Sequence, residues 1–234
     1  MPHPIEDRTE ADRLSRRSTL ARAGGLAAAA LGAASLPAEA ASSGGAAGSV
    51  TCVLAPELTE GPYYLPNEKL RRNITEGLPG ATMSLRLTVV DATTCKPIKG
   101  AAVDIWHASA GGKYSGEQAN ATLGQTFLRG IQRTDASGLA LFTTVYPGWY
   151  QGRTVHIHVK VHVGGSVVHT GQLFFRDSFT DAVYRRAPYN GRSARDVRNR
   201  DDSIYLDGGS RSLLRLRSVG KGYVASISMG VRRS

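Results

Sequence analysis

Residues 154–163 read TVHIHVKVHV, a strict alternation of polar and β-branched residues. Successive side chains of a strand point to opposite faces, so the pattern predicts a strand with one polar and one apolar face. Four side chains would share the polar face: His156, His158, Lys160 and His162. The pair Gly164-Gly165 follows directly and predicts a two-residue hairpin turn into the next strand.

Runs of the same kind recur on both sides of this strand, separated by residues that favour turns. We expect strands near Met83–Val90, Ala101–Trp106, Phe127–Gln132, Leu139–Thr144, Thr154–Val163, Ser166–Phe175, Leu213–Leu216 and Tyr223–Met229. The sequence of Asp135–Gly138 predicts a turn between two of these strands. Asp177–Gly209 is long and polar, and we expect it to form a surface excursion, a long connection outside the sheets that can include a short helix. The pattern predicts one all-β domain over residues 51–234, a β-sandwich of mostly antiparallel strands with long surface loops.

The sequence of the first 40 residues indicates an export signal, so we expect that this segment is not part of the folded domain. The pair Arg16-Arg17 precedes an apolar, Ala-rich stretch, Ala23–Leu36, and an A-x-A cleavage site ends at Ala40. Paired arginines favour the twin-arginine route, with an ordinary secretory signal as the alternative. The apolar stretch is too short for a good membrane anchor. We therefore expect a secreted protein in which residues 41–50 form a flexible linker.

The composition is basic, with 29 Lys and Arg against 19 Asp and Glu and a formal net charge of +10. Nucleic-acid binding would require such a charge, but no zinc-finger or RNP-like motif accompanies it. We interpret the charge as a solvated basic surface and predict no nucleic-acid partner. Two cysteines in an exported protein suggest one disulfide, Cys52–Cys95, and two unrelated thiols are the alternative.

His156 and His158 form an H-x-H pair that directs two imidazoles toward one point. Such a pair is a good bidentate platform for a metal ion. The same pattern also occurs on the solvent-facing side of strands without metal, so the pair alone leaves both interpretations open. His162 shares the face, but it lies about 13 Å beyond His158 at about 3.3 Å per residue and is excluded as a ligand.

Three motifs upstream of the H-x-H pair favour the metal site. Residues 59–64 read TEGPYY, residues 105–114 read IWHASAGGKY, and residues 144–153 read TVYPGWYQGR. In this order and spacing they resemble the intradiol ring-cleavage dioxygenases, such as protocatechuate 3,4-dioxygenase and catechol 1,2-dioxygenase. The resemblance spans roughly residues 52–205 and is strongest to the secreted branch of the family.

The resemblance implies a non-haem iron(III) cofactor and four protein ligands. Tyr114 is the last residue of the IWHASAGGKY motif, Tyr150 is the last residue of the TVYPGWY part of the next motif, and His156 and His158 are the histidine ligands. Iron(III) prefers anionic oxygen donors, and a trivalent ion favours the ionised form of tyrosine, whose ordinary pKa is about 10. The resemblance further implies that a catechol displaces Tyr150, which then helps to accept a proton, while Tyr114 stays bound.

The resemblance also implies two more catalytic residues. Arg153, three residues before the first histidine, would stabilise negative charge that develops on the ring. Gln172 matches a glutamine of the family with a gap of one residue. Tyr63 and Tyr64 are expected to line the substrate cleft. The implied reaction cleaves a catechol-type ring with O2, between the two hydroxylated carbons, to a cis,cis-muconate-type diacid.

Two other classes of protein explain parts of the pattern. A non-catalytic secreted β-sandwich binding module would account for the export signal and the fold, but not for the ordered tyrosines and histidines. A different metalloenzyme, with zinc or copper on the His156–His158 strand, would account for the histidines alone. We expect Tyr146 and Trp149 to pack, and His107 either to pack or to support the site. The natural catechol and the presence of a homo-oligomer stay open.

Overall fold

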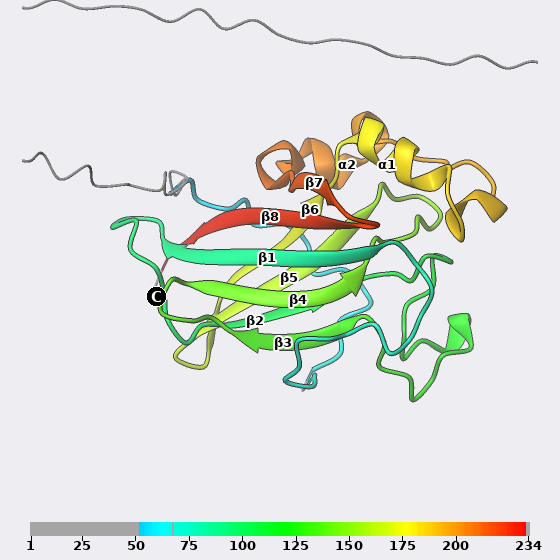
Figure 1. The fold of residues 1–234 in the computed structure, drawn as a ribbon. Coiled ribbons are helices and arrows are strands. Elements are labelled where there is room, and N and C mark those ends of the chain that lie inside the picture. The colour runs from blue at the N-terminus through cyan, green and yellow to red at the C-terminus, as the bar shows by residue number, and fades with distance from the viewer. Residues whose placement is uncertain (1–51, 67, 233–234) are drawn as a thin grey trace, which may run out of the picture. The chain divides into compact units, whose positions relative to one another are not determined.

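A computed structural model of the chain describes residues 52–66 and 68–232. The predicted export signal, residues 1–40, and the linker, residues 41–50, lie outside this described part. Eight strands of the described part form two four-stranded sheets that pack face to face (Figure 1). The predicted all-β sandwich of mostly antiparallel strands is confirmed.

The first sheet has the strand order β4–β1–β8–β7. Its strands are β1 (Thr82–Asp91), β4 (Leu139–Val145), β7 (Arg215–Val219) and β8 (Gly222–Val231). Neighbouring strands are antiparallel except for β1 and β8, which run parallel. The two longest strands therefore lie side by side at the centre of this sheet.

The second sheet has the order β3–β2–β5–β6, and all of its pairs are antiparallel. Its strands are β2 (Ala102–Trp106), β3 (Arg129–Arg133), β5 (His156–Val163) and β6 (Ser166–Phe174). The predicted hairpin turn joins β5 to β6, with φ of 60° at Gly164 and 91° at Gly165. Both values fall in the left-handed region that such a turn requires and that glycine adopts without strain.

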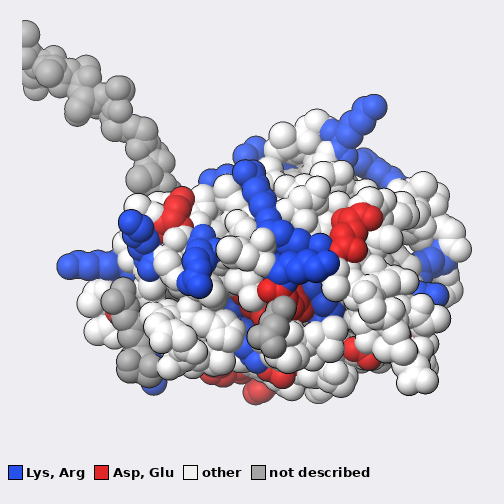
Figure 2. Space-filling view, turned by 90° about the horizontal axis from the view of Figure 1, so that it is seen from below, with Lys and Arg blue, Asp and Glu red and all other residues white. Residues whose placement is uncertain are grey.

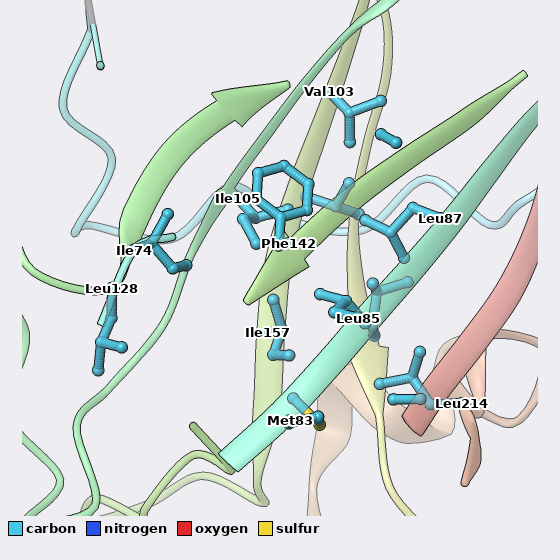
Figure 3. Close-up of a cluster of buried hydrophobic side chains, with 14 of the residues drawn as sticks. Ile74, Met83, Leu85, Leu87, Val103, Ile105, Leu128, Phe142, Ile157 and Leu214 are labelled. Atoms are coloured by element: carbon cyan, nitrogen blue, oxygen red, sulfur yellow. The ribbon is translucent and has the colours of Figure 1, made fainter. Parts of the chain in front are cut away.

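The apolar faces of the two sheets form one core between the layers (Figure 3). The labelled core residues from β1, β2, β4 and β5 are each fully buried: Met83, Leu85, Leu87, Val103, Ile105, Phe142 and Ile157. Residues of β5 alternate as predicted until a register shift between Val161 and His162 ends the regular pattern. The polar face of β5 consequently points away from the core, toward the other side of the second sheet.

Helices are short and lie mainly in the excursion predicted over Asp177–Gly209. This segment holds α1 (Asp177–Tyr184), α2 (Ser203–Leu206) and single turns of 3-10 helix, at the upper edge of the sandwich in Figure 1. The 3-10 turns of the described chain are η1 (Gln118–Asn120), η2 (Tyr189–Gly191), η3 (Asn199–Asp201) and η4 (Gly209–Ser212). None of the described helices has the length and apolarity needed to cross a membrane.

Three strands begin two residues later than predicted. The strand predicted from Phe127 begins only at Arg129, because Leu128 has a φ of 57° and breaks the extended conformation. The strand predicted from Thr154 begins at His156. The last short strand starts two residues late, because Leu214 donates its amide hydrogen to Phe174 of β6 before the chain joins β8.

The segment from Cys52 to Tyr64 begins beside β8 of the first sheet, where Leu54 forms a parallel bridge with Gly230, and then contacts β6 and β5 of the second sheet. The predicted Cys52–Cys95 disulfide is present, with a Cα–Cα distance of 5.2 Å. Further along, the Leu58 amide donates to the Thr170 carbonyl of β6, and Lys160 of β5 forms an ion pair with Glu60. These contacts hold the TEGPYY motif against the strand that carries the H-x-H pair.

Basic and acidic side chains are interspersed on the face of the molecule shown in Figure 2. Several arginines of the described chain form ion pairs with nearby carboxylates, including Arg71 with Glu76 and Arg198 with Asp181. Exposed pairs of this kind contribute little to stability. They agree with the interpretation of the basic composition as a solvated surface.

Candidate metal centre

The two histidines of the H-x-H pair lie side by side on the polar face of β5, and both are buried. The Nε2 atoms of His156 and His158 are 3.1 Å apart. Nδ1 of His156 lies 2.7 Å from the carbonyl oxygen of Thr154. A carbonyl can only accept, so Nδ1 carries the hydrogen and Nε2 presents a free lone pair to the cluster.

Two tyrosines from separate loops complete the cluster. The hydroxyl of Tyr150 lies 3.2 Å from Nε2 of His156. Tyr114 comes from the loop between β2 and β3, and its ring packs edge-on against Tyr150 at 5.5 Å and His158 at 6.1 Å between centroids. The hydroxyl of Tyr114 is buried and has no hydrogen-bond partner among the described residues. The structure therefore brings together all four residues that the sequence proposed as ligands.

Burial keeps this cluster uncharged in the absence of a cation. It lowers the pKa of His156 to about 3, with the charge of Arg153 as a smaller cause, and it holds the pKa of His158 well below its ordinary value. Burial likewise raises the pKa of Tyr114 well above 10 and raises that of Tyr150. A bound cation would reverse the preference of the tyrosines, because it favours the ionised oxygen.

The donor set fits a hard, highly charged metal ion. A buried hydroxyl without a partner is unfavourable, and a metal ligand role would satisfy the Tyr114 oxygen. No group of three or more His, Cys, Asp or Glu that could hold a metal exists within the described residues. A metal at this cluster would thus have to use tyrosine oxygen together with imidazole nitrogen, which suits iron(III) better than the thiolate-preferring ions.

Arg153 and Gln172 lie beside the cluster and contact each other. Nη2 of Arg153 donates to Oε1 of Gln172 at 2.6 Å, and Nε donates to a carboxylate oxygen of Asp202 at 2.9 Å. Gln172 in turn donates to the carbonyl of Thr59 at 2.8 Å. The guanidinium is therefore held on two sides, and its charge reaches Tyr150 and His156.

Asp202 is a residue of this site that sequence reasoning missed. It is buried, it accepts from the Thr154 amide at 2.8 Å, and it caps α2 by accepting from the Tyr205 amide at 2.9 Å. It stands 49 residues beyond Arg153, within a segment rich in both arginine and aspartate. No local pattern separates it from its acidic neighbours, because only tertiary packing brings it to Arg153.

Aromatic rings surround the four candidate ligands. The ring of Tyr63 stacks on Tyr114 at 4.3 Å and meets Tyr150 edge-on at 5.9 Å. Trp106 stacks on His158 at 4.9 Å with an interplanar angle of 5°. The ring of Tyr64 packs against the Trp106 ring at 4.9 Å in a tilted arrangement. Tyr63 thus contacts two candidate ligands directly, whereas the printed ring contact of Tyr64 is with Trp106.

The other residues singled out from the sequence lie away from the cluster. His107 bridges the sheets, with Nε2 2.7 Å from the Thr144 hydroxyl, so it packs and does not reach the ligands. Tyr146 is in the core, with its hydroxyl 2.7 Å from that of Thr180. Trp149 packs against the guanidinium of Arg192. A cavity of about 890 Å³ beside β7 and β8 also contacts none of the four candidate ligands.

Comparison with known proteins finds similarity to one family of enzymes. A family model described as Dioxygenase matches residues 59–181. The structure resembles an intradiol ring-cleavage dioxygenase from Tetranychus urticae, with 35% identity and a TM-score of 0.73 over 77% of this chain and 95% of that one. No match was found among curated protein sequences.

Two further solved structures are similar. The first is the dioxygenase domain of a dioxygenase carbohydrate-binding protein fusion from Streptomyces sp. SirexAA-E, at 29% identity, TM-score 0.62, and coverage of 78% of this chain and 100% of that one. The second is catechol 1,2-dioxygenase from Pseudomonas arvilla C-1, at 24% identity, TM-score 0.57, and coverage of 76% and 62%. The second likeness is one of fold alone.

These findings define the class as ring-cleaving oxidoreductases built on a β-sandwich. The chain belongs to the intradiol ring-cleavage dioxygenase family.

Proposed function

We propose that this chain is an exported, iron(III)-dependent intradiol dioxygenase that cleaves catechol-type rings with O2 to cis,cis-muconate-type diacids. The observation that carries the proposal is the convergence of two tyrosines and two histidines on one point. Enzymes of the family generally use non-haem iron(III), and the donor set here suits that ion. A non-catalytic binding module would not need a buried tyrosine hydroxyl left without a partner.

Tyr114, Tyr150, His156 and His158 would hold the iron. Two ionised tyrosines would offset most of its charge, so the resting centre would be stable in the ferric state. When bound, iron(III) supplies the Lewis acidity that activates a coordinated catecholate toward O2. Substrate binding, substrate orientation and proton transfer would depend on the side chains of the protein.

The exposure of the two tyrosines supports different roles for them. Tyr114 is 2% exposed and is covered by Tyr63, whereas Tyr150 is only partly buried and lies in the short turn before β5. A ligand in such a turn can move aside at low energetic cost. We assign to Tyr150 the role of the ligand that the substrate displaces and that accepts a substrate proton.

Arg153 supplies a fixed positive charge beside the reacting ring. The Asp202 carboxylate and the Gln172 amide hold its guanidinium, so little reorganisation is needed as negative charge develops. Tyr63 contributes an aromatic surface above the cluster, and a flat catechol ring fits against such a surface. This arrangement binds the ring, orients it and excludes water from one side.

Export is part of the proposal and rests on the sequence of residues 1–40. The twin-arginine route suits an enzyme that takes up its iron before it leaves the cytoplasm. A disulfide between Cys52 and Cys95 supports an oxidising destination, because such bonds are rare in reducing compartments.

The test is a spectrum, a metal analysis and an oxygen-uptake assay on the purified protein. Tyrosine bound to iron(III) absorbs visible light, so we expect a reddish protein with one iron per chain that consumes O2 when catechol is added. His158→Ala should lose colour and turnover. His162→Ala is the matched control, since it lies on the same strand beyond the register shift and should keep both. A colourless wild-type protein with stoichiometric zinc and no O2 uptake would contradict the proposal.

A further inference from the structure

Arg129, the first residue of β3, is a buried arginine beside the metal centre. It is 2% exposed, and its guanidinium forms hydrogen bonds in three directions. Nε donates to the Ser115 hydroxyl at 2.9 Å, Nη2 to the Ser115 carbonyl at 2.8 Å, and Nη1 to the Tyr63 carbonyl at 2.6 Å. Nη1 also lies 3.3 Å from the Glu68 carboxylate.

These contacts involve the two segments that carry the stacked aromatic pair. Ser115 directly follows Tyr114, and the Tyr63 carbonyl belongs to the residue whose ring covers Tyr114 at 4.3 Å. The planar fork of an arginine holds its donors in fixed directions, so one side chain sets both backbones relative to each other. Lysine, with a single flexible ammonium group, cannot reproduce this geometry.

The sheet register connects Arg129 to the other side of the cluster. Arg129 of β3 pairs with Trp106 of β2, and Trp106 pairs with His158 of β5. The three side chains form a row across the second sheet, and the Trp106 ring stacks on the His158 ring. Arg129 therefore ends a row that begins at a candidate iron ligand, and Tyr114 lies above that row, with its ring centroid 6.0 Å from the guanidinium carbon.

Burying a guanidinium away from water is unfavourable unless its donors are satisfied. Glu68 accepts one hydrogen bond, and the Glu117 carboxylate lies 4.0 Å from Nη2. The remaining hydrogen-bond acceptors are backbone and hydroxyl oxygens of the two segments described above. A residue needed only for stability at this position could be an apolar side chain that packs against Trp106. The specific contacts of Arg129 instead join the loop that carries Tyr114 to the backbone of Tyr63.

We propose that Arg129 is a positioning residue that fixes the Tyr114 ligand under the Tyr63 ring. It thereby sets the orientation of the tyrosine oxygen toward the metal and the height of the aromatic surface over the substrate. This inference rests on the proposed function, because it assumes that Tyr114 binds iron.

The test compares Arg129→Lys with wild type, both purified with iron. Arg195→Lys is the matched control, since the Arg195 side chain is 4% exposed, against 3% for Arg129, and its fork bonds Asp177 and Asp181 of α1, with no contact to the cluster. We expect Arg129→Lys to retain iron but to shift the visible tyrosine-to-iron band. Turnover of catechol should fall at least about tenfold, because misplacement of a reacting group by about 1 Å can cost 100-fold, and KM should rise.

Ser115→Ala provides a milder second variant in case Arg129→Lys does not fold. It removes one acceptor of the arginine fork, and we expect a smaller band shift in the same direction. If the spectra and the turnover of both variants match those of Arg195→Lys, Arg129 is a structural residue only and the inference is wrong. A colourless, inactive wild-type protein would contradict the proposed function instead, so the two failures are distinguishable.

Discussion

Individual side chains at the cluster differ mainly in burial and in how they are held. Tyr114 is sealed under Tyr63, Tyr150 lies in a turn at the edge, and the His156 ring is oriented by the Thr154 carbonyl. Each of these differences is set by one or two contacts. Conservative substitutions that remove one hydroxyl or add one methyl group should therefore separate the roles of these residues.

Replacing Tyr150 with Phe removes the hydroxyl proposed as the displaceable ligand and internal base. Three protein ligands remain, so we expect the variant to keep some iron while turnover falls by about 100-fold, as is typical for the loss of an acid–base group. Tyr114→Phe should instead lower iron retention, because the resting centre loses a buried anionic ligand. Iron content and catechol turnover, measured on both variants, test the assignment.

Tyr146→Phe is the control for both tyrosine variants, because the Tyr146 hydroxyl contacts Thr180 in the core. It should leave the visible spectrum unchanged. Loss of colour in Tyr146→Phe, together with an active and coloured Tyr150→Phe protein, would show that the wrong tyrosine of residues 146–150 was assigned to the metal.

Gly61→Ala should disturb the centre from the TEGPYY segment. A Cβ at this position would lie 3.0 Å from Cε1 of His158, and the φ of 74° adds backbone strain of about 1 kcal/mol for a residue other than glycine. We expect weaker iron retention, measured by metal content after dialysis. Gly77→Ala is the control, with a similar φ of 77° and open space around its Cβ. Equal iron content in the two variants would refute the contact with His158.

The functional elements are the two sheets and the segment that crosses one of them. β5 supplies both histidines, β2 places Trp106 under His158, and β3 supplies Arg129. The covering segment, Cys52 to Tyr64, is attached at one end by the disulfide and along its length by side chains of β5 and β6. Its attachment decides how firmly Tyr63 is held over the cluster.

The Cys52–Cys95 bond spans 43 residues of chain and should contribute about 2–4 kcal/mol to stability by restricting the unfolded state. We expect the Cys52→Ser, Cys95→Ser double variant to lose that amount in equilibrium denaturation. Its iron content should change little, because Gln172 and Lys160 still hold the segment near the cluster. A double variant with wild-type stability would show that the unfolded state gains little freedom when the bond is removed.

The whole molecule keeps its apolar core between the sheets and a charged, buried layer under the covering segment. Glu68 and Asp104 lie in this layer with Arg129, and Lys160 is a neighbouring positive charge. Burial raises the pKa of Glu68 to about 8 and that of Asp104 to about 7, and repulsion between the two carboxylates adds to the rise for Glu68. The folded protein therefore holds protons that the unfolded chain would release.

Stability should consequently fall as the pH rises from about 4.5, the ordinary pKa of a glutamate, toward 8. Below this window the folded and unfolded states both bind the proton, so this carboxyl group no longer makes the stability depend on pH. Glu68→Gln mimics the protonated side chain, so it should reduce the loss by about 1 kcal/mol or more between pH 5.5 and 8.5. Thermal unfolding of wild type, Glu68→Gln and the control Asp201→Asn, whose exposed carboxylate pairs with the exposed Arg200, tests this at both pH values. Equal pH dependence in all three proteins would show that Glu68 is ionised throughout.

Patterns along the chain are enough to predict the sandwich, its eight strands and the four candidate ligands. Alternation and turn residues are local signals, and the tyrosine and histidine motifs keep their order and spacing along the chain. Local signals also predicted the hairpin at Gly164-Gly165. They failed at strand ends such as Leu128, where a left-handed residue interrupts an apolar run.

The residues that support the site become visible only when the chain is folded. Asp202 reaches Arg153 from the helical excursion, and Arg129 joins Tyr63 to the loop of Tyr114. Each contact links segments far apart in sequence, and a buried charge shows no periodicity that would distinguish it from a surface charge. The partner of a buried charge depends on which distant segment of the chain packs beside it. The packing of the two sheets determines that segment, and the neighbouring residues in the sequence do not.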